Sequence, residues 1–102
     1  MNYTKSKHEN RYWLANGNVF ELHFKQFYDD QIILKFVKDE YIPDSYIYVS
    51  ELLKVEDDSI FADSVEDAME QFEDMIVDHI EDEISYYEEM LEKFQEESYE
   101  TN

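Results

Sequence analysis

Apolar residues follow two different periods along this chain, one in each half of the sequence. In the first half they alternate with polar residues, as in Phe20, Leu22 and Phe24, which are separated by Glu21 and His23. That alternation is the pattern of a strand with one buried face. In the second half apolar residues recur every three or four positions, which is the period of an amphipathic helix. The sequence therefore predicts an α+β fold in which strands precede a helix.

The strands of the first half are expected to form a small antiparallel meander. Asn16-Gly17 favours a hairpin with a type I′ turn, which needs positive φ at both central residues. Asp29-Asp30 marks a second turn, residues 39–44 form a loop, and residues 50–54 form a short helical turn or connector. The prediction is a three- to four-stranded β-meander with strands at residues 11–15, 18–24, 31–37 and 45–49.

One long helix is expected after Ser64, packed against the meander. Ser64 and Asp67 form an approximate capping box, and acidic residues there meet the positive end of the helix dipole. No Gly or Pro interrupts residues 64–98, and an unbroken helix of that length is about 50 Å long. Strands of five to seven residues are only about 17 to 24 Å long. The helix end therefore projects, or the helix breaks near residues 82–85 and folds back, or a partner covers it.

A chain of 102 residues closes one small core, so we expect a single domain at residues 1–102. Trp13, Tyr46 and Tyr48 alternate onto the other face of the sheet. There they roof a second small cluster with the N-terminal segment, or cover a sheet edge, or form a contact patch or dimer surface. The second half of the helix is likewise a candidate for self-association into a homodimer. The expected core consists of Phe20, Leu22, Phe24, Ile32, Leu34, Phe36, Val65, Met69, Phe72, Ile76 and Ile80.

The negative charge of the chain is concentrated in its second half. Residues 1–54 carry seven Lys/Arg against eight Asp/Glu, and residues 55–102 carry Lys93 against nineteen Asp/Glu, so a near-neutral meander (−1) precedes an acidic helical region (−18) in a chain of net charge −19. With 43% hydrophobic and 17% aromatic residues, the chain is too apolar for a disordered acidic tail. Its surface should repel nucleic acid and anionic lipid, so the expected partner is a basic protein.

Most enzyme chemistry has no support in the sequence. The absence of cysteine removes thiolate nucleophiles and Cys-ligated metals, and fits a reducing compartment. There is no phosphate-cradling Gly loop and no nucleophile elbow. His79 lies four residues before Glu83, but a helix this acidic produces such pairs by chance. We therefore expect no enzyme, no cofactor, no metal site and no membrane span, in a cytoplasmic protein.

The carboxylates of the helix are the candidate binding residues. Fourteen acids occupy residues 64–98, about one per 3.6 Å of helix axis, against one phosphate per about 3.4 Å along a DNA strand. Like charges three or four residues apart each destabilise a helix by about 0.2 to 0.5 kcal/mol, so the near exclusion of Lys favours a function for the array. Two rows of carboxylates are expected beside the apolar stripe, with a partner-binding face made of Glu66, Asp67, Glu70, Glu73, Asp74, Asp78, Glu81, Asp82, Glu88, Glu89, Glu92 and Glu96.

At the level of class, this chain resembles the acidic DNA-mimic inhibitors of phages and mobile elements, of the anti-restriction or anti-CRISPR type. The resemblance rests on small size, the absence of Cys, a composition typical of AT-rich coding sequence, and the acidic region 55–100. It implies a non-catalytic inhibitor that occupies the basic nucleic-acid-binding channel of a nuclease, such as a restriction enzyme or CRISPR effector, in the host cytoplasm if phage-encoded. The alternative is an immunity, antitoxin-like or adaptor protein that binds one basic partner without mimicking DNA.

Overall fold

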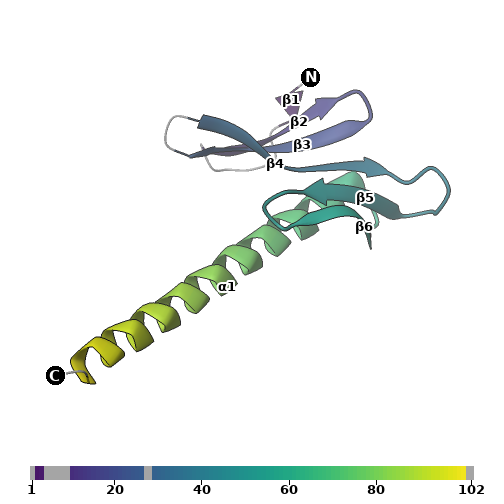
Figure 1. Cartoon of the computed structure of the whole chain (residues 1–102). Helices are drawn as coiled ribbons and strands as arrows, with labels where there is room; N and C mark the ends of the chain where they lie inside the picture. The colour runs from purple at the N-terminus through teal and green to yellow at the C-terminus, as the bar shows by residue number, and fades with distance from the viewer. Residues whose placement is uncertain (1, 4–9, 27–28, 101–102) are drawn as a thin grey trace. The chain divides into compact units, whose positions relative to one another are not determined.

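A computed structural model describes the backbone of residues 2–3, 10–26 and 29–100, and the side chains of residues 10–25 and 30–96. In this part of the chain strands precede one long helix, and the α+β prediction is confirmed (Figure 1). The elements are β1 (Asn2–Tyr3), β2 (Arg11–Asn16), β3 (Val19–Gln26), β4 (Asp29–Lys38), β5 (Ser45–Ser50), β6 (Val55–Phe61) and α1 (Val65–Glu100).

The chain divides into two compact units, Met1–Met69 and Glu70–Asn102. The first unit holds the sheet and the first turn of α1, and the second holds the remainder of the helix. Helix α1 is continuous over 36 residues, which corresponds to about 54 Å of helix axis. Of the alternatives left open by the sequence, a break near residues 82–85 is therefore wrong.

The sheet is an antiparallel meander in the order β1-β2-β3-β4-β5-β6. It has five strands of six or more residues and the two-residue β1, so the predicted count of three to four was too low. The error lies in β6, which we had assigned to the acidic helical region. Glu56, Asp57 and Asp58 interrupt its apolar pattern, because β6 is an edge strand whose exposed acids face solvent. Charged side chains on an edge strand discourage pairing with other sheets.

The predicted hairpin between β2 and β3 is confirmed, but its turn lies one residue later than expected. Asn16 pairs with Val19, so the two loop residues are Gly17 and Asn18. Gly17 has φ +64°, while Asn18 is not among the residues with positive φ. Positive φ at the first loop residue alone is the pattern of a type II′ turn rather than type I′.

A β-bulge between β3 and β4 corrects the predicted position of Ile32. Leu22 pairs with Leu34, but the next pair is His23 with Ile32, so Ile33 is an extra residue in β4. An extra residue moves every side chain beyond it to the opposite face. Ile32 therefore shares a face with His23 and is exposed rather than part of the core.

Ser50 supports this bulge from β5. Its hydroxyl donates to the carbonyl oxygen of Ile33 over 2.7 Å and accepts a hydrogen bond from the N–H of Leu53 over 3.1 Å. The first bond satisfies the carbonyl of the extra residue, and the second helps to form the turn at residues 51–54 that leads into β6. These two bonds explain why a serine is buried here, since a buried hydroxyl is costly without partners.

The core of the first unit is aromatic, and it lies on the face that carries Leu22 and Leu34. Trp13 pairs with Leu22, and Tyr48 pairs with Phe36, so Trp13 and Tyr48 share this face with the predicted core residues. Both are buried, as is Tyr46. The expected second face and the exposed contact patch for Trp13, Tyr46 and Tyr48 are therefore wrong.

Phe36 is the centre of this core. Trp13 and Tyr46 meet its ring edge-to-face at centroid distances of 5.4 and 5.8 Å, and Phe20 stacks on it at 5.1 Å. These are favoured aromatic geometries. Ala68 and Met69, from the first turn of α1, are also fully buried.

Replacing Gly17 with Ala should destabilise the first unit by about 1 to 3 kcal/mol, because an L side chain is strained at this positive φ. An added Cβ would meet no atom within 4 Å, so backbone strain alone causes the loss. Urea denaturation followed by the fluorescence of Trp13, the single tryptophan, measures it. Asn18→Ala is the control and should change stability by less than about 0.5 kcal/mol. Equal stability of Gly17→Ala and the wild type would contradict the turn assignment.

Candidate acidic partner-binding surface

Helix α1 begins at a cap that the sequence predicted. The hydroxyl of Ser64 accepts a hydrogen bond from the N–H of Asp67 over 3.0 Å, and the carboxylate of Asp67 accepts one from the N–H of Asp63 over 3.1 Å. The N–H of Ala68 donates to the carbonyl of Ser64 over 2.9 Å, which closes the first turn. The N–H of Asp67, one of the backbone donors that a helix start normally leaves open, is thus satisfied, and the Asp67 carboxylate binds the N–H of the residue just before the cap.

The acids of the first helical turn act on a tyrosine of the sheet. Burial raises the pKa of Tyr46, and the negative charges of Asp44, Glu66 and Asp67 raise it further. Burial also raises the pKa of Tyr48, with a smaller effect from Asp58. Both phenols are therefore protonated at neutral pH, and no further negative charge is added at this end of the sheet.

The twelve predicted binding residues are mostly accessible. Asp67 and Glu73 are half-buried, and the other ten are exposed. Phe72 and Ile76 are the last buried residues of the helix, and from residue 77 to residue 96 every side chain is exposed except the half-buried His79 and Glu83. Between residues 70 and 96 eleven acids stand against Lys93, a net charge of −10.

Most of these acids lie on one flank of the helix. A rotation of about 100° per residue places nine of the eleven within an arc of about 120°, and only Glu73 and Glu83 lie outside it. We call these nine residues the acidic flank: Glu70, Asp74, Asp78, Glu81, Asp82, Glu88, Glu89, Glu92 and Glu96. The sequence interpretation had expected a row on each side of the apolar stripe, whereas this geometry gathers the charge on one side.

An exposed apolar stripe runs beside the acidic flank. Its exposed fractions include 52% for Ile84, 56% for Leu91 and 68% for Phe94. The stripe alternates steps of three and four residues, which is the a and d spacing of a heptad repeat. We call it the apolar seam: Val77, Ile80, Ile84, Tyr87, Leu91 and Phe94.

Two ion pairs of the second unit join side chains that the structure describes. Lys93 lies 3.3 Å from Glu89, and Nε2 of His79 lies 3.6 Å from a carboxylate oxygen of Glu83. Both pairs join residues four apart, and the first is well exposed. Pairs of this kind contribute only about 0.3 to 0.5 kcal/mol. The acidic flank is therefore a region of strong mutual repulsion.

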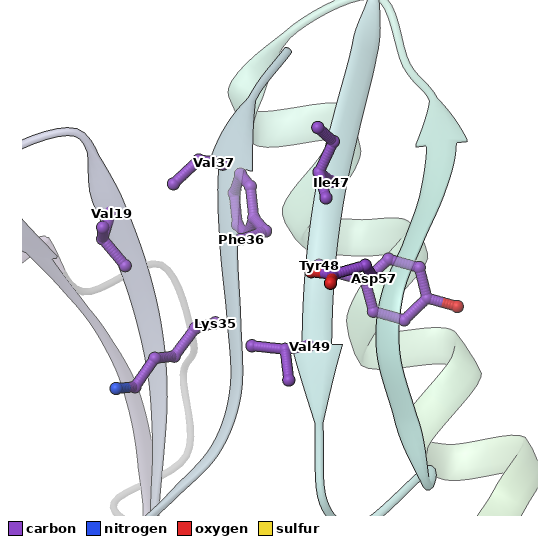
Figure 2. Close-up of a pocket in the computed structure, with 8 residues that line it drawn as sticks. All are labelled: Val19, Lys35, Phe36, Val37, Ile47, Tyr48, Val49 and Asp57. Carbon is purple, nitrogen blue, oxygen red and sulfur yellow. The ribbon is translucent and has the colours of Figure 1, made fainter.

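The first unit carries an apolar hollow that the sequence interpretation missed. It has a volume of about 230 Å³ and lies on the sheet face opposite the aromatic core, where Val19, Val37, Ile47 and Val49 meet (Figure 2). Lys35, Phe36, Tyr48 and Asp57 also line it. The alternating pattern of residues 45–49 does identify Ile47 and Val49 as neighbours on one face of a strand. That they share a hollow with Val19 and Val37 can be seen only once the pairing register of three strands is known.

A polar cluster around His23 was also missed. Nε2 of His23 lies 3.1 Å from Oε1 of Glu21, and Nδ1 lies 3.3 Å from Oδ1 of Asp30. The ring of Tyr12 stacks on the imidazole with 4.8 Å between the ring centroids, and the Tyr12 hydroxyl donates a hydrogen bond to the carboxylate of Asp30. The side chains of this cluster form hydrogen bonds with one another, and they come from three neighbouring strands. In the described part of the chain, no three His, Asp or Glu side chains gather as a metal-binding group.

The described residues contain no helix that is both long enough and apolar enough to cross a membrane. Comparison of the chain with protein-family models, with curated proteins and with solved structures finds no match.

Raising NaCl from about 0.01 to 0.1 M should stabilise α1, because the screening length falls from about 30 to 10 Å. Five like-charged pairs of the acidic flank are four residues apart, at about 0.2 to 0.5 kcal/mol each, so the expected gain is about 1 kcal/mol. Thermal unfolding monitored by circular dichroism at the helix band measures it. The triple variant Asp74→Asn, Asp78→Asn, Asp82→Asn should respond less to salt. A steady loss of stability with salt would refute the self-repulsion.

The pKa of Asp30 tests the cluster around His23. The hydrogen bond from Tyr12 holds the pKa of this carboxyl below its ordinary value of 3.8, with a smaller contribution from His23. A lowered folded-state pKa stabilises the fold above pH 3.8, and this stabilisation is lost as the pH falls through the folded pKa. Tyr12→Phe should raise the pKa of Asp30 in an NMR titration. Tyr41→Phe, in an exposed loop, is the control, and equal effects would argue against the assignment.

Proposed function

We propose that this protein is a DNA-mimic inhibitor that occupies the basic nucleic-acid-binding channel of a nuclease or another DNA-binding protein. A restriction enzyme or a CRISPR effector fits best, and the inhibitor would act in the host cytoplasm without catalysing a reaction. The observation that carries the proposal is the acidic flank, an ordered row of exposed carboxylates on an unbroken helix. Lys and Arg of a DNA channel bind such a row as they bind phosphates.

The charge density of the flank supports this proposal. Its nine carboxylates span residues 70–96, about 39 Å of helix axis or one charge per about 5 Å. A DNA strand carries one charge per about 3.4 Å. The flank is thus somewhat sparser than one strand, and the flexible stems of Lys and Arg can bridge the difference. Attraction between the two surfaces would speed association and weaken with salt.

The apolar seam favours a second candidate function. A DNA backbone presents no row of Ile, Leu and Phe, so a pure mimic has no use for an exposed seam beside its charges. An immunity, antitoxin-like or adaptor protein that recognises one basic partner by shape would use both. The two functions differ in whether the partner's DNA site is occupied.

Competition with DNA separates the two candidates. The partner is captured from a host lysate, identified and purified, and its affinity for this protein is measured with and without duplex DNA. A mimic is displaced by DNA and inhibits cleavage of the DNA substrate. A complex that survives saturating DNA and leaves cleavage intact would instead establish the adaptor.

Neutralising the acidic flank should weaken the complex. Glu88→Gln, Glu92→Gln and Glu96→Gln together remove three charges and should lower the affinity by about tenfold or more, mainly by slowing association. Surface plasmon resonance at two salt concentrations measures both rates. The matched control removes three exposed charges from β6 by Glu56→Gln, Asp57→Asn and Asp58→Asn, and should change the affinity by less than about threefold. Equal losses from both triple variants would mean that net charge, not the flank, drives binding.

A further inference from the structure

We propose that the apolar seam of α1 is a docking surface for a helix of the partner, one that carries an apolar stripe with Lys or Arg along its edge. This inference rests on the part of the proposed function that both candidates share, a basic protein partner, because it names the kind of element on that partner that the acidic helix would meet. Its occupant is a basic amphipathic helix rather than a nucleic acid or a second copy of this chain.

The spacing of the seam points to a helix as the occupant. Val77, Ile84 and Leu91 stand seven residues apart, and so do Ile80, Tyr87 and Phe94. Residues at a and d of a heptad repeat form knobs that fit into holes on a facing helix. The seam extends over residues 77–94, about 26 Å of helix axis, which is the length of a partner helix of roughly five turns.

The side chains of the seam are exposed in the part of the chain that the structure describes. All six of its side chains are exposed, from 42% for Val77 and Ile80 to 68% for Phe94. A contiguous row of large apolar side chains on a surface marks an interaction site. Buried apolar residues of α1 stop at Ile76, so the exposed seam begins where the buried part of the helix ends.

Charge beside the seam decides which helix fits it. With the seam residues at a and d, Glu81 and Glu88 occupy e positions and Glu83 occupies a g position. In coiled coils the e and g residues pair across the interface and set partner choice. A partner with Lys or Arg at these edges would neutralise Glu81, Glu83 and Glu88, and its remaining basic residues would meet the acidic flank.

The same geometry disfavours a second copy of this chain as the occupant. In a parallel pair Glu83 of one chain would face Glu88 of the other, and in an antiparallel pair Glu81 would face Glu88. Two segments of net charge −10 each would then lie about 8 to 10 Å apart, a separation comparable to the screening length of about 8 Å at physiological salt, so their repulsion would be only partly screened. The homodimer considered from the sequence is therefore disfavoured at this surface.

A synthetic peptide of about three heptads tests the docking, with Ile at a, Leu at d and Lys at e and g. The lysines prevent the peptide from pairing with itself. Isothermal titration calorimetry with the full chain should show one peptide bound per chain. A peptide with Ala at a and d keeps the charge and the helix propensity but should bind about tenfold more weakly or worse, and one with Glu at e and g should not bind.

Variants of the protein place the peptide on the seam. Ile84→Gln with Leu91→Gln should weaken binding of the Lys peptide about tenfold. Tyr86→Gln, an equally exposed aromatic outside the seam, should change it by less than about twofold. Circular dichroism checks that the helix is retained in both. The comparison of the Ala and Lys peptides uses the unmodified protein. The docking can therefore still be tested if a variant loses its helix.

Three outcomes would overturn the inference. Equal binding of the Ala and Lys peptides would show that the seam is not used, while the proposed function of the acidic flank would stand. Sedimentation of the free chain as a dimer that Ile84→Gln with Leu91→Gln dissociates would make a second copy the occupant. Equal losses from the seam variant and Tyr86→Gln would place the peptide elsewhere. Unchanged peptide binding after neutralisation of Glu92 and Glu96, which do not border the seam, would leave the inference intact and count against the proposed function alone.

Discussion

Repulsion among carboxylates on one flank of a single helix is the constraint on which the rest of this molecule depends. A segment with a net charge of −10 between residues 70 and 96 gains little helical stability from side-chain pairs. Its backbone is nevertheless helical without interruption. The sequence permits this because it contains good helix formers and neither Gly nor Pro in the segment, and because nine of the eleven acids lie on one side, where water and salt screen them.

The start of the helix is where order is imposed. Ser64 satisfies the open backbone N–H of Asp67, the carboxylate of Asp67 binds the N–H of Asp63, and Ala68 and Met69 are buried in the first unit. Forming the first turn is the costly step of helix formation, and each later residue adds to an existing helix. A capped and buried first turn therefore supplies the nucleus that the acidic segment is poorly suited to form alone. The near-neutral sheet, with its aromatic core around Phe36, provides that foundation.

The features that the sequence predicts correctly are those that depend on interactions between residues close together along the chain. The hairpin at Gly17 and the cap at Ser64 depend on neighbouring residues, and both were predictable, although the turn type was not. The face of Ile32 was not predictable, because one extra residue at Ile33 reverses the alternation. Strand β6 was missed because solvent, not a core, surrounds Glu56, Asp57 and Asp58.

The candidate site was predictable in its residues but not in its arrangement. Counting Asp and Glu identifies the acids, and a period of 3.6 identifies the apolar stripe. Whether that stripe is covered depends on what packs against it, which no local pattern encodes. The exposure of Ile84, Leu91 and Phe94 therefore changes the interpretation from a core helix with an acidic back to a helix that presents two different surfaces.

These two surfaces would serve different stages of one binding event. Attraction between the acidic flank and a basic groove acts over many ångströms and mainly raises the rate of encounter. Burial of apolar side chains acts only at contact, so it mainly lowers the rate of dissociation. Charge alone would bind every basic groove weakly and release it readily in salt. Because the seam lies beside the flank on one continuous helix, only a basic partner with an apolar stripe in the matching position would engage both, and this requirement would convert general electrostatic attraction into selectivity.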